Sequence, residues 1–513
     1  MTATSASVTP GTTPGTTPGL DPDFDPALHE EMAAVDRLVE VDAGTTNRPR
    51  SVQRLRDWEY LERQQHRLVL AVARYASEWE DIVTMHRFVW EQAECVRRLR
   101  ERLVQFPGGQ ANLDQPVSSE LEALGNAVLE APTHADLVEG VWGLYGHAVN
   151  RSYAFYAAHA HPIHDKPTLE LINEVLRIKE GFRLWLHAFR RRVDEQGVAL
   201  DAAYREKVLA AVAGCGELMS PLEPTDPPAQ PVGVATGHRL PAFAARPAGS
   251  APRADPMPTV IARFRTDVQV RRFWWSFAYA KEINLAMDQL LWLWDAPYMP
   301  WEFHHDISRH LWDESRHGDS GHSRLLDFGI TLQELGLGSY DPDEPWSDRP
   351  PTIPQLGDDA PGALPATGHA VPRTPAQLYE RMYHIGMLAE SGHFTVKRQG
   401  YEDFKAGGDM ESAEMMLFDV VDEQTHVQYS HRWLPLLAEH AGIDASDYRQ
   451  RAAKERKELA DQAAAEAAAA EASPPDPDSP GAQLCERMLA KMQAAHPLSN
   501  ADDHAPRAMI PML

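Results

Sequence analysis

Cysteine is scarce in this chain of 513 residues. The three cysteines are Cys95, Cys215 and Cys485, and none belongs to a Cys-x-x-Cys pair. This spacing argues against a zinc ribbon and against a disulfide scaffold, and it suits a reducing compartment. Apolar residues make up 43% of the chain, enough to bury a sizeable core. We therefore expect a cytoplasmic protein that folds by packing its core.

Positive charge and long apolar runs are also scarce. The chain has 49 Lys and Arg against 75 Asp and Glu, a formal charge of −26. Such a balance argues against binding to nucleic-acid phosphates and to anionic membranes. No apolar run is long enough to span a bilayer, which takes about 18 residues or more. Residues 1–30 are rich in Thr, Pro and Gly and lack the regions of a signal peptide.

Alternating strand patterns are nearly absent, whereas apolar residues recur at helical spacing over long stretches. The sequence therefore predicts an all-α protein. Each half has two helices, a long crossover and two more helices, which is typical of a ferritin-like four-helix bundle. We thus expect two such bundles in tandem, the second of them metal-binding. The predicted helices cover 60–75, 78–104, a segment from about 135, 167–192, 201–219, 259–294, 299–326, 374–404, 411–440, 446–472 and 484–494.

Composition divides the chain into five parts. A disordered tail rich in Thr, Pro and Gly is followed by the first bundle, which lacks metal ligands. A linker rich in Pro and Ala leads to a di-iron bundle, and a helical extension with a flexible tail ends the chain. In order, these parts are 1–45, 46–220, 221–257, 258–450 and 451–513.

The two halves resemble each other. Trp79-Glu80 and Trp90-Glu91 match Trp301-Glu302 and Trp312-Asp313 at one constant offset, which suggests a tandem duplication.

At the same offset, Gln92 and Cys95 stand where the second half has a Glu and a His. Val149 falls opposite Glu390. The last helix leaves two registers open, with either Glu180 and Arg183 or Lys179 and Phe182 opposite the second-half pair. In both registers the first half lacks the metal ligands of the second.

Two Asp-Glu-x-x-His segments dominate the second half. They are Asp313 to His317 and Asp422 to His426. A Glu and a His three residues apart lie on one face of a helix, so both side chains reach a single metal ion. Two such pairs, with one further Glu from each of two other helices, form a carboxylate-bridged two-metal site.

Glu282 and Glu390 supply the further carboxylates, because each lies one helix before a pair. The predicted metal ligands are therefore Glu282, Glu314, His317, Glu390, Glu423 and His426. Oxygen and nitrogen donors of this kind suit iron or manganese more than zinc–thiolate chemistry. Four carboxylates also neutralise two divalent ions.

Several neighbours of these residues have open roles. His310 shares a face with Glu314, and His393 shares one with Glu390, so each is either an extra ligand or a supporting histidine. Gly386 lies one turn before Glu390 and either leaves room for substrate or packs helices together. A further pair, Glu302 and His305, has no partner pair and is interpreted as surface.

The order of these residues resembles the ferritin-like di-iron carboxylate superfamily. WDESRHGD at 312–319 is similar to the second-helix motif of the soluble acyl-carrier-protein desaturases, and VDEQTH at 421–426 resembles their last-helix motif. The resemblance implies two iron ions, or a manganese–iron pair. It also implies that Asp313 and Asp422 accept hydrogen bonds from the ligand histidines.

The favoured function is an O2-dependent di-iron oxidase or oxygenase that acts on a small organic substrate bound beside Gly386. Electrons would come from a separate donor, because no glycine-rich nucleotide motif follows a strand. A homodimer is compatible with the sequence. The alternatives are a ferroxidase or iron-handling protein, and a scaffold that uses the metals only for stability.

Overall fold

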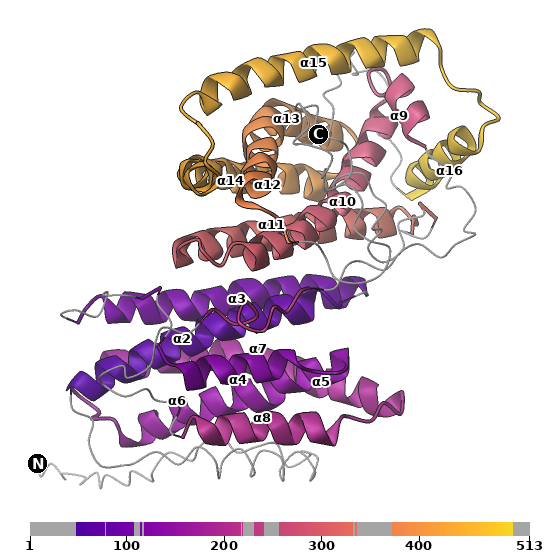
Figure 1. The fold of residues 1–513 in the computed structure, drawn as a ribbon. Coiled ribbons are helices and arrows are strands. Elements are labelled where there is room, and N and C mark those ends of the chain that lie inside the picture. The colour runs from indigo at the N-terminus through magenta and orange to yellow at the C-terminus, as the bar shows by residue number, and fades with distance from the viewer. Residues whose placement is uncertain are drawn as a thin grey trace, which may run out of the picture.

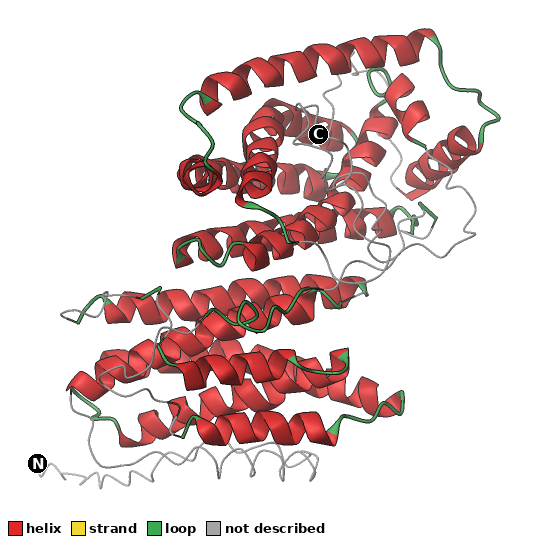
Figure 2. Ribbon diagram, viewed as in Figure 1, coloured by secondary structure: helices red, strands yellow, loops and turns green. Residues whose placement is uncertain are grey.

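The fold is helical in all of its described elements. The computed structural model describes residues 48–76, 78–106, 113–114, 117–216, 218, 230–240, 256–331, 334–335 and 372–495. Within those ranges the regular elements are helices and none is a strand (Figure 2). The prediction of an all-α protein is confirmed for this part of the chain. The expected N-terminal tail, most of the linker and nearly all of the crossover at 335–373 lie outside the described residues.

The first half contains three long helices, α2, α3 and α7, with shorter ones packed around them. Its core is fully buried at Trp58, which contacts Tyr153, and at Phe88, which contacts Phe182. The helices are α2 (Arg48–Ala73), α3 (Trp79–Leu103), α4 (Ser119–Leu129), α5 (His134–Val138), η1 (Glu139–Gly146), α6 (His147–His159), α7 (Lys166–Glu195) and α8 (Ala202–Gly214).

The second half repeats this order with additions at both ends. Its helices are α9 (Met257–Arg263), α10 (Val268–Asp295), α11 (Trp301–Asp327), α12 (Pro375–Met382), η2 (Tyr383–Glu390), α13 (Ser391–Ala406), α14 (Met410–Ala441), α15 (Tyr448–Ala472) and α16 (Pro480–Ala495). Figure 1 shows α15 and α16 on the side of this half that faces away from α2 and α3.

The halves meet where α11 lies along α3 (Figure 1) and α10 contacts α2. Two histidines of the first half reach buried serines on α11. The imidazole Nε2 of His66 is 2.8 Å from the hydroxyl of Ser308, and Nδ1 of His86 bonds the hydroxyl of Ser315. One face of α11 is thereby fixed against the first half, and its other face is left for the metal centre.

The third long helix of each half contains a π-helical stretch. In the first half η1 separates α5 from α6, and in the second η2 separates α12 from α13. Both composite helices begin at a threonine cap: Thr133 accepts from the amide of Asp136, and Thr374 from that of Gln377. A π stretch is rare and frequently lies at a functional site. In the second half it ends at Glu390, one of the predicted ligands.

Two glycines set the close approach of α10 and α11. A Cβ atom on Gly321 would lie 2.3 Å from the backbone nitrogen of Ala280, and one on Gly318 would lie 3.0 Å from that of Ile283. Only glycine permits this contact. It brings Glu282 of α10 beside His317 of α11.

Four segments differ from the sequence prediction. The single helix expected over 259–294 is divided into α9 and α10, because the chain turns at residues 264–267. Helix α4 lies where a plain connection was expected, and it buries Leu121 and Leu124. Within the predicted linker, Val232 and Leu240 are buried. Helix α16 is longer than predicted and packs Cys485 against α9 and α10. Among the described residues, no helix combines the length and apolar character needed to cross a membrane.

Candidate metal centre

Four helical segments of the second half point carboxylates and imidazoles at one another. Helix α10 contributes Glu282, η2 contributes Glu390, and α11 and α14 contribute the remainder. The structure brings together all six predicted ligands in three overlapping groups of donor atoms, which also include His310 and Asp419. All of these side chains are buried except that of Glu282, which is partly exposed.

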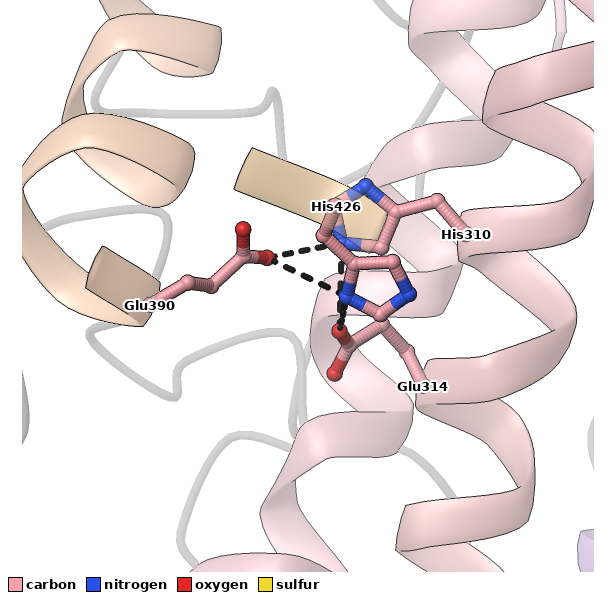
Figure 3. A group of neighbouring side chains, drawn as sticks. All are labelled: His310, Glu314, Glu390 and His426. Atoms are coloured by element: carbon pink, nitrogen blue, oxygen red, sulfur yellow. Dashed lines mark hydrogen bonds and ion pairs between the residues drawn. The ribbon is translucent and has the colours of Figure 1, made fainter. Parts of the chain in front are cut away.

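The first group is formed by His310, Glu314, Glu390 and His426 (Figure 3). Nδ1 of His426 lies 3.3 Å from Oε1 of Glu314 and 3.6 Å from Oε1 of Glu390. His310 approaches the same two oxygens, at 3.1 and 2.8 Å. The two imidazoles stack with centroids 3.7 Å apart. His310 therefore lies within the donor cluster, in contact with two of its carboxylates.

The second group shares Glu314 with the first. Nδ1 of His317 lies 3.3 Å from Oε2 of Glu282 and 3.9 Å from Oε2 of Glu314. The two oxygens of Glu314 thus face different sets of donors, Oε1 toward His426 and Oε2 toward His317. A carboxylate in this position can bridge two cations.

Many of these converging atoms have no hydrogen-bond partner, although they are buried. The unpartnered atoms are Glu282 Oε2, His317 Nδ1, Glu390 Oε1 and Oε2, Asp419 Oδ1, Glu423 Oε2 and His426 Nδ1. A buried polar atom without a partner costs free energy, and native proteins contain few of them. Cations bound within the three donor groups would satisfy these atoms, so the donor set fits a metal site.

The far nitrogens of the two histidines face aspartates across the helix pair. Nε2 of His317 on α11 lies 3.3 Å from Asp422 on α14, and Nε2 of His426 lies 3.3 Å from Asp313 on α11. Arg316 joins both aspartates, and Arg309 lies 2.8 Å from Asp313. These contacts orient each imidazole so that Nδ1 faces the donor cluster.

Two residues of the centre were not singled out from the sequence, Lys397 and Asp419. Nζ of Lys397 lies 2.6 Å from Oδ2 of Asp419 and also bonds Glu423. Tyr279 donates its hydroxyl proton to Asp419. Spacing gave a signal for Asp419, which lies one turn before Glu423, whereas the burial of Lys397 depends on the fold.

The electrostatic environment differs along the cluster. Burial raises the pKa of Glu282 to about 8. Burial also favours the neutral form of Glu390, but His310 nearby outweighs it and lowers the pKa of Glu390 to about 2. For His317, burial is outweighed by Asp419 and the other carboxylates, which raise its pKa well above the usual range. The carboxylates of the cluster therefore stabilise a positive charge placed between them.

Four other residues discussed in the sequence analysis lie outside the three donor groups. His393 is half-buried and does not belong to any of the three donor groups. A Cβ on Gly386 would lie 1.8 Å from the hydroxyl of Ser430, so the glycine packs η2 against α14 and the expected room for substrate there is wrong. Glu302 and His305, interpreted as surface, are partly exposed and belong to none of the donor groups.

Those two residues contact the first half. His305 lies 2.9 Å from Glu94, and Glu302 lies 3.4 Å from Arg100.

The corresponding place in the first half holds an internal ion pair. Nζ of Lys179 lies 2.8 Å from Oε2 of Glu62, and both side chains are buried. Gln92 and Tyr153 donate hydrogen bonds to the same carboxylate. Lys179 and Phe182 are the buried residues of α7 here, which decides between the two registers that the sequence left open.

Comparison with known proteins adds no relative: no family model, curated protein or solved structure matches the chain.

Proposed function

We propose that the second half is an O2-dependent oxidoreductase whose two-metal centre oxidises a small organic substrate. The observation that carries the proposal is the position of Glu314, whose two carboxylate oxygens face separate sets of donors. The resemblance of both Asp-Glu-x-x-His segments to the ferritin-like di-iron carboxylate superfamily supports iron, or manganese with iron, and a ferritin-like bundle. Two ions would be held between Glu282, Glu314 and His317 on one side and His310, Glu314, Glu390 and His426 on the other, with Glu423 near both.

Charge supports two divalent ions. The centre contains five carboxylates and one ammonium, a formal charge of −4 that two divalent cations neutralise. These groups are Glu282, Glu314, Glu390, Asp419, Glu423 and Lys397. Lys397 thus offsets the extra carboxylate of Asp419, and the count of four that the sequence predicted is preserved. A neutral cluster is the form in which so many charges are tolerated in a protein interior.

Bound iron would supply the electrons that reduce O2. The chain's own residues hold and orient this chemistry. Asp422 and Asp313 fix the orientation of the two imidazoles through their Nε2 atoms. Tyr279 and Lys397 hold Asp419 in place. A separate protein or small molecule would return electrons between turnovers.

Metal content and O2 uptake test this function. We expect the anaerobically loaded full chain to bind two transition-metal ions and the Glu314→Ala, His426→Ala double variant to lose at least one. The matched control is the Glu302→Ala, His305→Ala variant, which removes the same sequence motif away from the cluster. Full retention of two ions in the first double variant would sink the ligand assignment.

The same preparations separate the three functions. Uptake of O2 that yields an oxidised organic product, in a panel of small substrates with a chemical reductant, supports the oxidoreductase. Uptake that tracks added Fe(II) alone marks a ferroxidase. Bound metal without any uptake marks a scaffold, and either of the last two results would overturn the proposal.

A further inference from the structure

A cavity with polar and apolar walls lies at the junction of the two halves, away from the metal centre. Its volume is about 560 Å3, and its walls include Arg67, His66, Trp301, His304, Val232 and Leu436. These residues come from α2, α11, α14 and the segment 230–240. The cavity is within the usual range of small-molecule sites, roughly 300–1,000 Å3.

The cavity and the metal centre use different faces of α11. Ser308 of α11 bonds His66, which lines the cavity, whereas His310 faces Glu390 in the donor cluster. A ligand in the cavity is therefore separated from the metals by the body of α11.

Arg67 is the side chain of the cavity wall that favours binding of a ligand. Its side chain is only 8% exposed. Nε donates to the carbonyl of Val232 at 2.6 Å and Nη2 to that of Trp294 at 3.0 Å, while Nη1 has no partner. Among the described residues, no carboxylate forms an ion pair with it. Arg67 also lies over the ring of Trp294, 4.2 Å from its centroid, and Asp295 and Glu122 act on it through longer-range electrostatics. Nη1 itself remains buried without a hydrogen-bond partner, which is costly for a charged group.

The other charges around the cavity are already compensated. Arg63 pairs with Glu59 at 2.8 Å, and Asp114 pairs with Arg100 at 2.9 Å. Burial, with Arg67 as a further cause, lowers the pKa of His304 to about 3, so that this imidazole is neutral at pH 7. Arg67 therefore remains the cationic group of the cavity wall without an ion pair, and its unpartnered Nη1 matches an anion of single charge.

The remaining walls of the cavity indicate the chemistry of the rest of the ligand, apart from its charged group. Val232, Met299, Trp301 and Leu436 offer apolar surface, and three prolines stand among them. A phosphate dianion would find one free cation and much apolar surface. A monocarboxylic acid would place its carboxylate on Nη1 of Arg67 and its apolar body against Trp301 and Leu436.

We infer that this cavity is a binding site for a small organic monocarboxylate, which Arg67 recognises by charge. Guanidinium groups suit carboxylates because their planar donors match the two oxygens. The site is independent of the metal centre and of the function proposed for it.

Calorimetric titration of the full chain with benzoate tests the inference, with hexanoate, benzamide and phosphate as comparison probes. We expect one saturable site for benzoate and weaker binding of neutral benzamide. Arg67→Met should weaken benzoate binding by roughly tenfold or more, because it removes a charged hydrogen-bond partner. Arg97→Met, a loss of charge on the outer face of α3, should leave binding unchanged.

A second variant keeps the test valid if Arg67→Met does not fold. Leu436→Trp fills the cavity and leaves Arg67 in place, so it should also weaken benzoate binding. The titration is repeated on the Glu314→Ala, His426→Ala variant to exclude binding at the metals. The inference is overturned if the parent chain binds no carboxylate, if benzamide or phosphate binds as well as benzoate, if either cavity variant that folds binds normally, or if removal of the metal ligands abolishes binding.

Discussion

Oδ2 of Asp422 lies 3.3 Å from Nε2 of His317, and the contact runs from α14 to α11. The reverse contact, from Asp313 on α11 to His426 on α14, has the same length. Each aspartate directly precedes a glutamate of the cluster but serves the histidine of the other helix. The two Asp-Glu-x-x-His segments therefore act as one unit, in which each helix orients the imidazole of its partner.

The first prediction concerns these aspartates. Asp422→Asn keeps the size and an acceptor but removes the charge that makes the imidazole more basic. We expect the variant to fold, to retain most metal at saturating iron, and to react with O2 about 10–100-fold more slowly. Asp313→Asn should behave alike. Stopped-flow oxidation of the reduced, iron-loaded proteins measures this, with Asp319→Asn on the exposed side of α11 as the control. Parental rates in both variants would show that the contacts do not tune the centre.

A second prediction concerns the buried ammonium. Lys397 is 2.6 Å from Asp419, and neither side chain is accessible to solvent to any great extent. Lys397→Met removes the ammonium from the buried carboxylates of Asp419 and Glu423, and loss of one partner of a buried ion pair elsewhere costs about 3–5 kcal/mol. We expect the metal-free variant to lose stability by that order in urea unfolding. The Lys397→Met, Asp419→Asn double variant should recover part of the loss. Equal stability of the single and double variants would mean that the two groups do not depend on each other.

The cluster shows which parts of a site can be predicted from spacing. Glu314 with His317, and Glu423 with His426, are neighbours along one helix, so their geometry follows from the helical repeat alone. To predict Glu282 and Glu390 as ligands, one must also assume that the chain returns as an antiparallel helix. The long segments with apolar residues at helical spacing made that assumption reliable.

Other parts depend on packing that spacing does not reveal. Lys397 looks like an ordinary solvated lysine in its sequence, and only the fold encloses it with Asp419 and Glu423. The register of α7 was open because Lys179 and Glu180 are both charged and differ by one position. The π-helical stretch before Glu390 has no marker in the sequence, and it shifts the residues that follow around the helix axis. The short helix α4 was missed because its apolar run was too brief to stand out.

The third prediction concerns the contact of η2 with α14. A Cβ on Gly386 would lie 1.8 Å from Oγ and 2.6 Å from Cβ of Ser430. Gly386→Ala should therefore lower stability, by about 1–3 kcal/mol for overpacking of this kind. Ser430→Gly removes both clashing atoms, so the Gly386→Ala, Ser430→Gly double variant should be more stable than the Gly386→Ala single variant. Thermal unfolding of the four proteins measures this. If the single variant is as stable as the parent, the two helices are not in close contact here.

The last prediction concerns pH and uses His86, which joins α3 to Ser315 at the junction of the halves. Burial lowers the pKa of this imidazole from 6.5 to about 3, so the folded protein keeps it neutral. Above pH 6.5 both folded and unfolded chains hold the neutral ring, and its full contribution to stability is present. As pH falls below 6.5, the unfolded chain binds a proton that the folded chain does not. Stability is then lost, by at most about 1.4 kcal/mol per pH unit, down to the folded pKa.

His86→Gln can still bond the Ser315 hydroxyl and does not titrate. Its free energy of unfolding should therefore fall less steeply than that of the parent between pH 6.5 and 5. Urea unfolding at several pH values across this window gives the slope of the unfolding free energy against pH for each protein. In the difference between the two slopes, the titration of groups common to both proteins cancels. His159→Gln, at an exposed position on α6, is the control and should keep the parental slope. Equal slopes in the parent and His86→Gln would show that His86 takes up its proton in the folded protein as readily as in the unfolded chain, and that the junction is open to water.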